Sequence, residues 1–465
     1  MIRVLQSVFI IILTPIAKIT IKINDRVRDI CIQIICFAFP LFFLYFYMWW
    51  KCPAIVVETL RPQTARHILG CLLMLLLIVV SIDRIPRKVQ WNKWIIYPLV
   101  TCGIWMLIIS FLHPVGDGYR AFASMLILGY PCVYFVWNNR GDYEKLFDPL
   151  ARALAIVCLL VFVYCFYLAT QGDFTIVGNR SAGLVTNSNV FSIIGMFGTC
   201  GAIYMLTKEG ISWIKFVLYS LSLGSSYAIV LMGASRTAAA ACLACLLVTV
   251  FFFFRYCKEK SATQRAVKVL SAIVLVIFMI ILSHICVDIQ KTIMLNEASS
   301  PTNTEVVSQN TSVLDRFTVD SEENMNTYSS GRVRIWKAYA SFFNLTGNDV
   351  SQANWDILTP NGEKKAHNNF FEMAYRFGVP LGILFIVLEI IICLKALQLL
   401  LFNRTKQQFL LLPILFTVMF LFLSMLDIAT LPFERDAPCY FYLAIIPMID
   451  TTYSFKNLIS KRDNG

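Results

Sequence analysis

The sequence predicts an all-α polytopic membrane protein. Of its 465 residues, 58% are hydrophobic and only 15% are charged. A soluble protein has roughly 25% charged residues and fewer than half apolar ones. Long apolar runs recur along the whole chain, and each can form a helix that crosses the hydrocarbon core of a bilayer. The composition therefore excludes an ordinary soluble domain.

Apolar windows predict about 12 transmembrane helices, with one large extracytoplasmic loop between the ninth and the tenth. The windows are 30–50, 67–82, 94–112, 120–137, 150–170, 187–206, 214–232, 237–254, 267–288, 377–400, 408–427 and 437–454. Residues 1–29 precede the first window. They contain Pro15 and Lys18 and lack a small-residue cleavage site. We therefore interpret their apolar part as an interfacial or re-entrant amphipathic segment.

The charges of the loops predict the orientation. With the N-terminus in the cytoplasm, the cytoplasmic loops hold far more Lys and Arg than the short loops on the other side. The net charge of +12 is therefore a topology signal. Nucleic acid is not an expected partner, because the basic residues are not gathered on one stripe. The same orientation places Arg180, Arg236, the long loop and His367 on the outer side.

This topology divides the chain into three parts. They are a membrane part with nine spans (1–288), an extracytoplasmic loop (289–376) and a membrane part with three spans (377–465). The first half of the loop is polar and poor in large apolar residues. The second half predicts an amphipathic helix that lies on the membrane surface or covers a cavity. Its common face carries Arg332, Trp336, Tyr339, Ala340 and Phe343.

Residues 366–382 connect this loop to the tenth span. As a single helix, they would place four residues on one face: His367, Phe371, Ala374 and Gly378. Glu372 and Arg376 would pair on another face. His367 would lie near the helix start, where free backbone N–H groups attract anions. A titratable imidazole beside such a site predicts chemistry on a phosphate-bearing lipid; the alternative is an interfacial histidine that caps a helix.

Arg180 and Arg236 are isolated cations, flanked by small residues, at the outer ends of the sixth and eighth spans. An arginine at the membrane centre costs roughly 2.5–3.5 kcal/mol on insertion scales, so such residues usually face a cavity or a partner. The alternative is that each reaches to lipid headgroups. A guanidinium can bond two phosphate oxygens at once, which suits a lipid diphosphate.

The other histidines, acidic residues and cysteines give weaker evidence for a functional site. His67, His113 and His284 each stand alone near a span end, where packing is the expected role. Glu389 and Asp427 could each be a buried partner or a structural polar contact. The cysteines, including the pair Cys242 and Cys245, lie mostly in apolar runs, where thiols behave as small apolar groups. No acidic pair or histidine cluster on the outer side predicts a metal site.

Several segments together resemble the O-antigen ligase family and its relatives, the bacterial polysaccharide polymerases. The similarity spans roughly residues 178–382 and comprises the Arg180 segment with its GLVTNSNVF continuation, Ser235-Arg236, the stretch from Ser330 to Trp336, and HNNFFEMAYRFGVPLG. The family usually has a proline between the two asparagines after its first arginine. Here that position is Ser188.

The resemblance implies a GT-C-like, metal-independent membrane glycosyltransferase without a cofactor. It would act at the extracytoplasmic side of the bacterial cytoplasmic membrane. Its partners would be membrane lipids, an undecaprenyl-diphosphate-linked glycan donor, and an acceptor glycolipid or glycan. By the resemblance, Arg180 and Arg236 would bind the diphosphate, with Arg332 as a secondary candidate. His367 would orient or deprotonate the acceptor hydroxyl.

Three alternatives remain open. A repeat-unit polymerase would use the same chemistry with a second lipid-linked repeat as acceptor. A transporter or flippase would have ionisable residues near the bilayer midplane and broken helices in two related halves. The sequence shows little of either. A structural subunit of a glycan-export complex is the third alternative.

Overall fold

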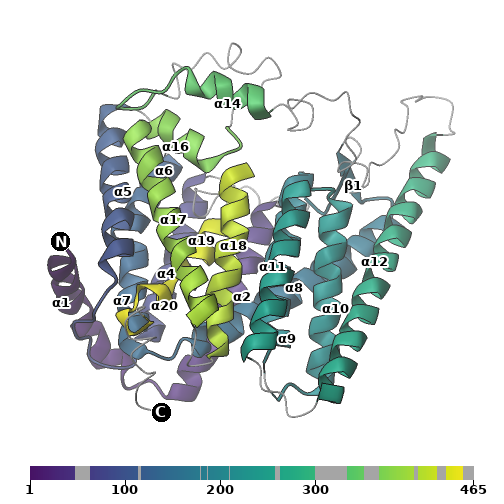
Figure 1. Cartoon of the computed structure of the whole chain (residues 1–465), viewed down its shortest axis with the longest axis horizontal. Helices are drawn as coiled ribbons and strands as arrows, with labels where there is room; N and C mark the ends of the chain where they lie inside the picture. The colour runs from purple at the N-terminus through teal and green to yellow at the C-terminus, as the bar shows by residue number, and fades with distance from the viewer. Residues whose placement is uncertain are drawn as a thin grey trace. The chain divides into compact units, whose positions relative to one another are not determined.

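The computed structural model of the chain is a set of helices with one short hairpin (Figure 1). It describes residues 1–47, 63–113, 117–177, 180–185, 187–208, 210–256, 262–298, 332–349, 366–402, 407–426 and 436–453. Contacts divide the chain into two compact units. Unit 1 comprises Met1–Phe39, Ala54–Phe147 and Asp320–Gly465, and unit 2 comprises Pro40–Pro53 and Asp148–Val319. The division differs from the three parts predicted from membrane topology, which remain a prediction.

Unit 1 combines helices from both ends of the chain. Its N-terminal elements are α1 (Ile2–Thr20), the first part of α2 (Asp25–Tyr47), α4 (Gln63–Ser81), α5 (Lys93–Leu112), α6 (Asp117–Ser124), the π-helix η2 (Met125–Gly129) and α7 (Tyr130–Arg140). Its later elements are α14 (Arg332–Ala340), α16 (Asn369–Phe377), α17 (Val379–Phe402), η3 (Gln408–Leu410), α18 (Leu411–Leu426), α19 (Asp436–Ala444), α20 (Ile446–Ile449) and η4 (Thr451–Tyr453). Close packing of α17 against α5 joins the two sets.

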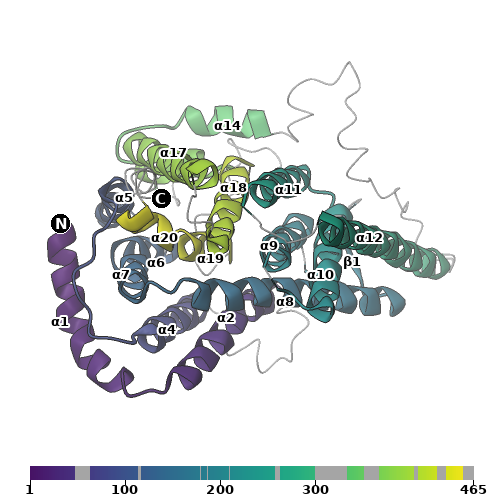
Figure 2. The same ribbon diagram turned by 60° about the horizontal axis from the view of Figure 1, so that its bottom comes forward.

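Unit 2 is built around α9. Its elements are most of α8 (Glu144–Thr170), strands β1 (Thr175–Val177) and β2 (Arg180–Gly183), α9 (Ser188–Leu206), α10 (Trp213–Met232), α11 (Arg236–Tyr256) and α12 (Ala262–Ala298). Figure 2 shows α9 between α8, α10 and α11. Three glycines of α9 (Gly195, Gly198 and Gly201) lie where an added Cβ would meet α8 or α10. Small residues allow membrane helices to approach closely, so α9 is the buried centre of this unit.

Eleven helices of the described residues are long and apolar enough to cross a membrane, which confirms the all-α polytopic class. The predicted boundaries need correction in places. The window 67–82 matches α4, whose apolar part, His67–Ser81, is shorter than these eleven helices. The window 437–454 is not one helix, because α19 ends at Ala444 and α20 begins at Ile446 with a proline in its first turn. Helix α12 continues to Ala298, into the predicted loop.

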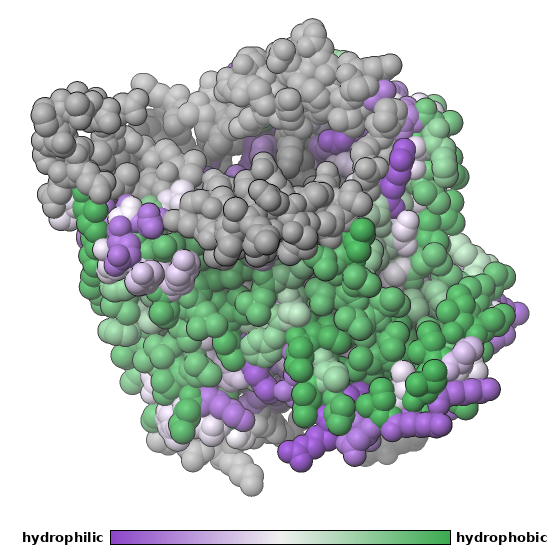
Figure 3. Space-filling model, turned by 180° about the vertical axis from the view of Figure 1, so that it is seen from behind, coloured by the Kyte–Doolittle hydropathy of each residue, from purple (hydrophilic) through white to green (hydrophobic). Residues whose placement is uncertain are grey.

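The outward-facing helix surfaces are apolar. In Figure 3, where the part of unit 1 around α1 and α2 lies on the right, the described surface is mostly hydrophobic. The strongly hydrophilic side chains of that part gather along its lower edge (Figure 3). Exposed residues of α1 and α2 include Ile11, Ile12, Ile30 and Ile34. Such a surface is suited to lipid and not to water.

Candidate functional site

In unit 2, Arg180 is held against the loop that leads into α11. It opens β2, which pairs antiparallel with β1, a hairpin that the sequence analysis did not predict. Its Nε and Nη2 both donate to the Gly233 carbonyl, at 2.9 and 2.6 Å, and Nη2 also donates to Asn189 Oδ1 at 2.8 Å. The guanidinium plane is therefore fixed by two separate elements.

Arg236 begins α11, three residues after the Gly233 carbonyl that Arg180 binds. Ser235 accepts a hydrogen bond from Ala238 N through its hydroxyl oxygen at 3.4 Å, which caps the helix start. The first turn of α11 contains no acidic residue. Because a helix N-terminus carries partial positive charge, an arginine there adds to a positive potential. Both predicted arginines thus lie at one end of unit 2.

The loop before α11 packs very tightly against α9. A Cβ at Gly233 would approach the Ser188 carbonyl within 2.8 Å and the Ser192 hydroxyl even more closely. Ser188 is the first residue of α9, behind Asn187, whose side chain accepts from the amides of Asn189 and Val190. The first helical position is also where proline is well tolerated. Serine in place of the family's usual proline therefore leaves this helix start intact.

In unit 1, His367 stands before a helix and not within one. Helix α16 begins at Asn369, and Asn368 accepts hydrogen bonds from the amides of Phe370 and Phe371. His367 itself has a φ of +49°, in the left-handed region. The predicted continuous helix is therefore wrong at this end, and the two capped amides are not available for an anion. The structure instead places the His367 imidazole, half-buried, on a tight turn before the helix.

The predicted helix is also wrong at its C-terminal end, because Gly378 lies beyond the last residue of α16. Gly378 terminates α16 with a φ of +89°, and a Cβ there would collide with the Leu345 carbonyl. Asn348 N donates to Tyr375 O at 2.9 Å, and Val379 N donates to Asn344 O at 2.8 Å. The loop 344–349 therefore closes the end of α16 before the chain turns into α17.

Helix α14 holds the turn that carries His367. Trp336 Nε1 donates to the Ala366 carbonyl at 2.9 Å, and the Trp336 ring stacks on Phe371 at 5.7 Å. Tyr339 meets Tyr375 edge-on at 4.9 Å. The predicted amphipathic helix exists, although its buried residues are Ile335 and Tyr339, while Ala340 is exposed.

Arg332, the remaining candidate for diphosphate binding, is the first residue of α14 and is partly exposed. It lies one helical turn before Trp336, the residue that bonds to the neighbour of His367. Arg332 therefore belongs to the helix that contacts the His367 turn.

A buried cluster of charged and polar side chains packs around Glu372 and Arg376 of α16. The predicted Glu372–Arg376 pair is confirmed, with Arg376 Nε bonded to Glu372 Oε1. Tyr119, which the sequence did not connect with this pair, donates to the same oxygen at 3.1 Å and lies under the guanidinium. Burial lowers the pKa of Arg376, but Tyr119 and Glu372 more than offset this and raise it overall. Glu372 Oε2 also accepts from Ala366 N at 3.2 Å, directly beside His367.

A second polar chain anchors the start of α16 to the membrane helices. Asn369 Nδ2 donates to Ser424 Oγ at 2.9 Å, and Ser424 Oγ donates to Glu389 Oε1 at 2.5 Å. Asn368 Nδ2 donates to the Met425 carbonyl at 2.9 Å. Of the two roles left open for Glu389, the structure shows a buried hydrogen-bond partner. Asp427 lies outside the described residues.

The other histidines and the cysteines have ordinary surroundings. His113 Nε2 is 2.8 Å from the Thr346 carbonyl, and His67 is buried. His284 is exposed on α12. Cys242 and Cys245 are both buried within α11. Among the described residues, no three His, Cys, Asp or Glu side chains are grouped so that they could hold a metal ion.

These features define a polytopic helical membrane protein with a cationic helix end in one unit and a braced histidine turn in the other. Residues 220–386 match the family model described as O-antigen ligase. This match supports assignment of the chain to the O-antigen ligase family, and it confirms the resemblance noted in the motifs. The matched region contains Arg236, Arg332 and His367, while Arg180 precedes it. No curated protein matches the chain.

Proposed function

We propose that this protein transfers a glycan from undecaprenyl diphosphate to an acceptor hydroxyl at the outer face of the cytoplasmic membrane, without a metal. The family assignment supports a membrane glycosyltransferase of the O-antigen ligase or polymerase type. The donor, acceptor and metal independence are part of the proposal. The observation that carries it is the contact of Arg180 with the loop that begins α11 at Arg236.

In the proposed reaction, the acceptor oxygen attacks the anomeric carbon of the donor sugar. The bond from that carbon to the diphosphate oxygen breaks, and the electron pair leaves with undecaprenyl diphosphate. Arg180 and Arg236, with Arg332 as a further contact, stabilise the charge that develops on the leaving group. His367 orients the hydroxyl and accepts its proton. The proposal requires these side chains to face the outer side of the membrane.

The Ala366–Asn369 turn explains how a histidine in a loop could serve this role. Its flanking residues are bonded to Trp336, Glu372, Ser424 and Met425. A catalytic side chain must be held close to its productive geometry, and a braced turn next to a rigid helix provides this.

The test is transfer activity of the purified protein in EDTA, with an undecaprenyl-diphosphate-linked glycan as donor. We expect Arg180→Ala, Arg236→Ala and His367→Ala each to lower the rate about 100-fold or more, because removal of one group that stabilises charge or transfers a proton typically costs that much. Arg255→Ala and His284→Ala are matched controls, because both residues are exposed and lie elsewhere in unit 2. Near-normal activity in two of the three site variants would refute the proposal.

The repeat-unit polymerase remains an alternative within the same family assignment, because the two activities differ in the acceptor. Deletion of the gene separates them. Loss of the glycan's attachment to its anchor, with chain length unchanged, indicates a ligase. Collapse of the surface glycan to single repeat units indicates a polymerase.

A further inference from the structure

Unit 1 contains a cavity of about 420 Å³ at the end of α17 that is remote from α16. Trp91, Lys93, Trp94, Lys395, Gln398 and Asp450 contribute to its lining. Lys395 follows the first residue of α17 by 16 positions, which is about 24 Å along a helix. The cavity is therefore separate from the His367 turn at the other end of the same helix.

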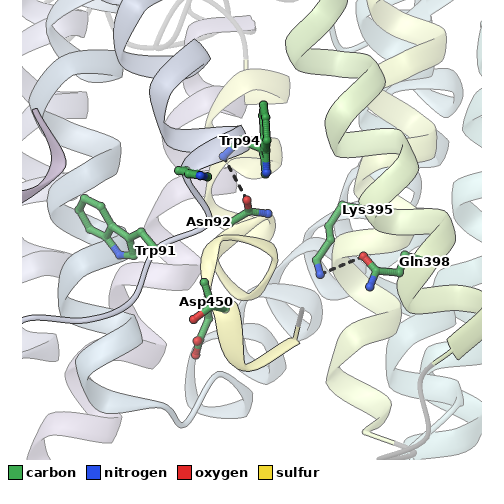
Figure 4. A pocket seen from close by; sticks show the side chains of 8 residues that line it. Trp91, Asn92, Trp94, Lys395, Gln398 and Asp450 are labelled. Atoms are coloured by element: carbon green, nitrogen blue, oxygen red, sulfur yellow. Dashed lines mark hydrogen bonds between the residues drawn. The ribbon is translucent and has the colours of Figure 1, made fainter. Parts of the chain in front are cut away.

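The wall of this cavity is preformed. Asn92 N donates to Ile449 O at 2.7 Å, and Thr451 N donates to Gln90 O at 3.2 Å, so two distant segments are paired along it. The Trp91 ring packs perpendicular to Phe135, with centroids 6.2 Å apart. Figure 4 shows Asn92 and Asp450 on one side of the opening and Lys395 with Gln398 on α17 opposite them.

The polar groups of the cavity favour an anion. Lys395 is only 7% exposed, and its Nζ donates to Gln398 Oε1 at 3.2 Å. The other atom of that amide, Gln398 Nε2, is buried and has no hydrogen-bond partner among the described residues. A buried N–H donor without a partner costs free energy that an acceptor oxygen would recover. Lys93 adds a second ammonium group at the first position of α5, where the helix dipole is positive.

Asp450 offsets only one of the two ammonium charges of the lining, and other donors already hold its carboxylate. Tyr143 OH donates to Oδ2 at 2.9 Å, while the Thr452 amide and hydroxyl donate to Oδ1 at 2.8 and 2.7 Å. With two lysines and one such carboxylate, the lining carries a net positive charge.

The surroundings of the cavity indicate a lipid and not a free phosphate. On α5, Trp94 is 68% exposed beside the cavity and Tyr97 is 44% exposed one turn further. On α17, Leu394 and Leu397 flank Lys395 and are 61% and 49% exposed. The cavity therefore opens beside apolar helix surfaces along which acyl chains can lie, with tryptophan at the headgroup level.

We propose that this cavity binds the phosphate of an anionic phospholipid, with Lys93, Lys395 and Gln398 as its donors. The acyl chains then lie along the exposed faces of α5 and α17. The loop charges that predict the topology place this end of α17 in the cytoplasmic leaflet. Recognition of a phospholipid here is independent of the glycosyl transfer proposed above.

Fluorescence quenching tests this assignment on the full chain in nanodiscs. Brominated phosphatidylglycerol and brominated phosphatidylcholine are compared, and the Trp94 contribution is obtained by difference from Trp94→Phe. We expect phosphatidylglycerol to quench Trp94 at lower mole fraction. Lys93→Gln should weaken this preference about fivefold, since each lysine near a lipid surface contributes about 1 kcal/mol. The double variant with Lys395→Gln should abolish it.

Lys88→Gln is the matched control, because this exposed lysine lies on the same loop and does not line the cavity. It should keep the full preference. Lys93 is itself exposed, so its variant remains informative if replacement of buried Lys395 impairs folding. An undiminished preference in Lys93→Gln would overturn the proposal. Full competition by millimolar glycerol phosphate would also overturn it, because the site would then take a soluble phosphate.

Discussion

At the scale of single residues, the surroundings of Arg180 show that it contributes specific hydrogen bonds as well as a positive charge. Two of its nitrogens converge on one carbonyl, and one of them also reaches Asn189. Only a planar group with several N–H donors can make these bonds together. Arg180 therefore links β2, α9 and the start of α11, in addition to its proposed contact with the diphosphate.

Arg180→Lys tests this double role. Lysine keeps the charge but cannot satisfy Gly233 O and Asn189 Oδ1 at once, so the loop before Arg236 loses its support. Bonds to a charged donor contribute about 1.5–3 kcal/mol each, and we expect transfer to fall at least tenfold in the EDTA assay. Arg255→Lys, at the other end of α11, is the control. Activity within twofold of the parent protein would show that the fork geometry is not needed.

We expect the Glu389 carboxylate to act as a hydrogen-bond acceptor for Ser424, a role that does not require its charge. It accepts the Ser424 hydroxyl, which in turn accepts Asn369 at the start of α16. We expect Glu389→Gln to retain most activity, because its amide oxygen can still accept. Glu389→Leu leaves the buried Ser424 hydroxyl without its acceptor, which costs about 1–3 kcal/mol. It should lower both the melting temperature and the rate. Equal behaviour of the two variants would exclude this hydrogen-bond chain as the reason that Glu389 matters.

At the scale of elements, the pairing of α14 with α16 connects the outer loop to the His367 turn. The contact combines a hydrogen bond, Trp336 Nε1 to Ala366 O, with the stacking of Trp336 on Phe371. The hydrogen bond ends on the residue directly before His367. An element nine residues long has little helical stability by itself, so packing against α16 is what keeps α14 folded.

Two substitutions at Trp336 separate these contributions. Trp336→Phe retains an aromatic ring but loses the N–H donor, and we expect a moderate loss of transfer, about tenfold or less. Trp336→Ala removes both contacts and should reduce transfer further, with membrane insertion unchanged. Lys337→Ala, an exposed position on the same helix, should have no effect. Transfer rates measured at equal protein level give the comparison, and wild-type activity in Trp336→Ala would contradict the proposed bracing.

At the scale of the whole molecule, hydrophobic runs predicted most membrane helices because apolar length is a property of consecutive residues. The break between α19 and α20 was missed, although Pro447 was a signal for it. The start of α16 was also missed, although asparagine at 368 is a preferred N-cap residue. The contacts of Arg180 with Gly233 and of Tyr119 with Glu372 join distant segments, which periodicity within one segment cannot predict.

The N-terminal helix poses the remaining question of topology. By length and composition, α1 could cross a membrane, whereas the sequence favoured an interfacial or re-entrant segment. Both of its ends are tied to the connection between α4 and α5. Gln6 Nε2 donates to Val89 O at 2.9 Å near one end. Near the other, Arg28 of α2 donates through Nη2 to Thr20 O at 2.8 Å. Its Nη1 donates to Ile82 O, at the start of that connection, and to Val80 O of α4 at 3.0 Å.

That connection carries Arg84, Arg87 and Lys88, so the positive-inside rule predicts that it is cytoplasmic. Because α1 is held to this connection directly through Gln6 and indirectly through Arg28 of α2, we expect it to lie along this surface with a cytoplasmic N-terminus. An epitope tag before Met1 should be protected from protease in spheroplasts and cleaved in inverted vesicles. A tag inserted near residue 310, in the predicted outer loop, should show the reverse. Cleavage of the N-terminal tag in intact spheroplasts would mean that α1 crosses the membrane.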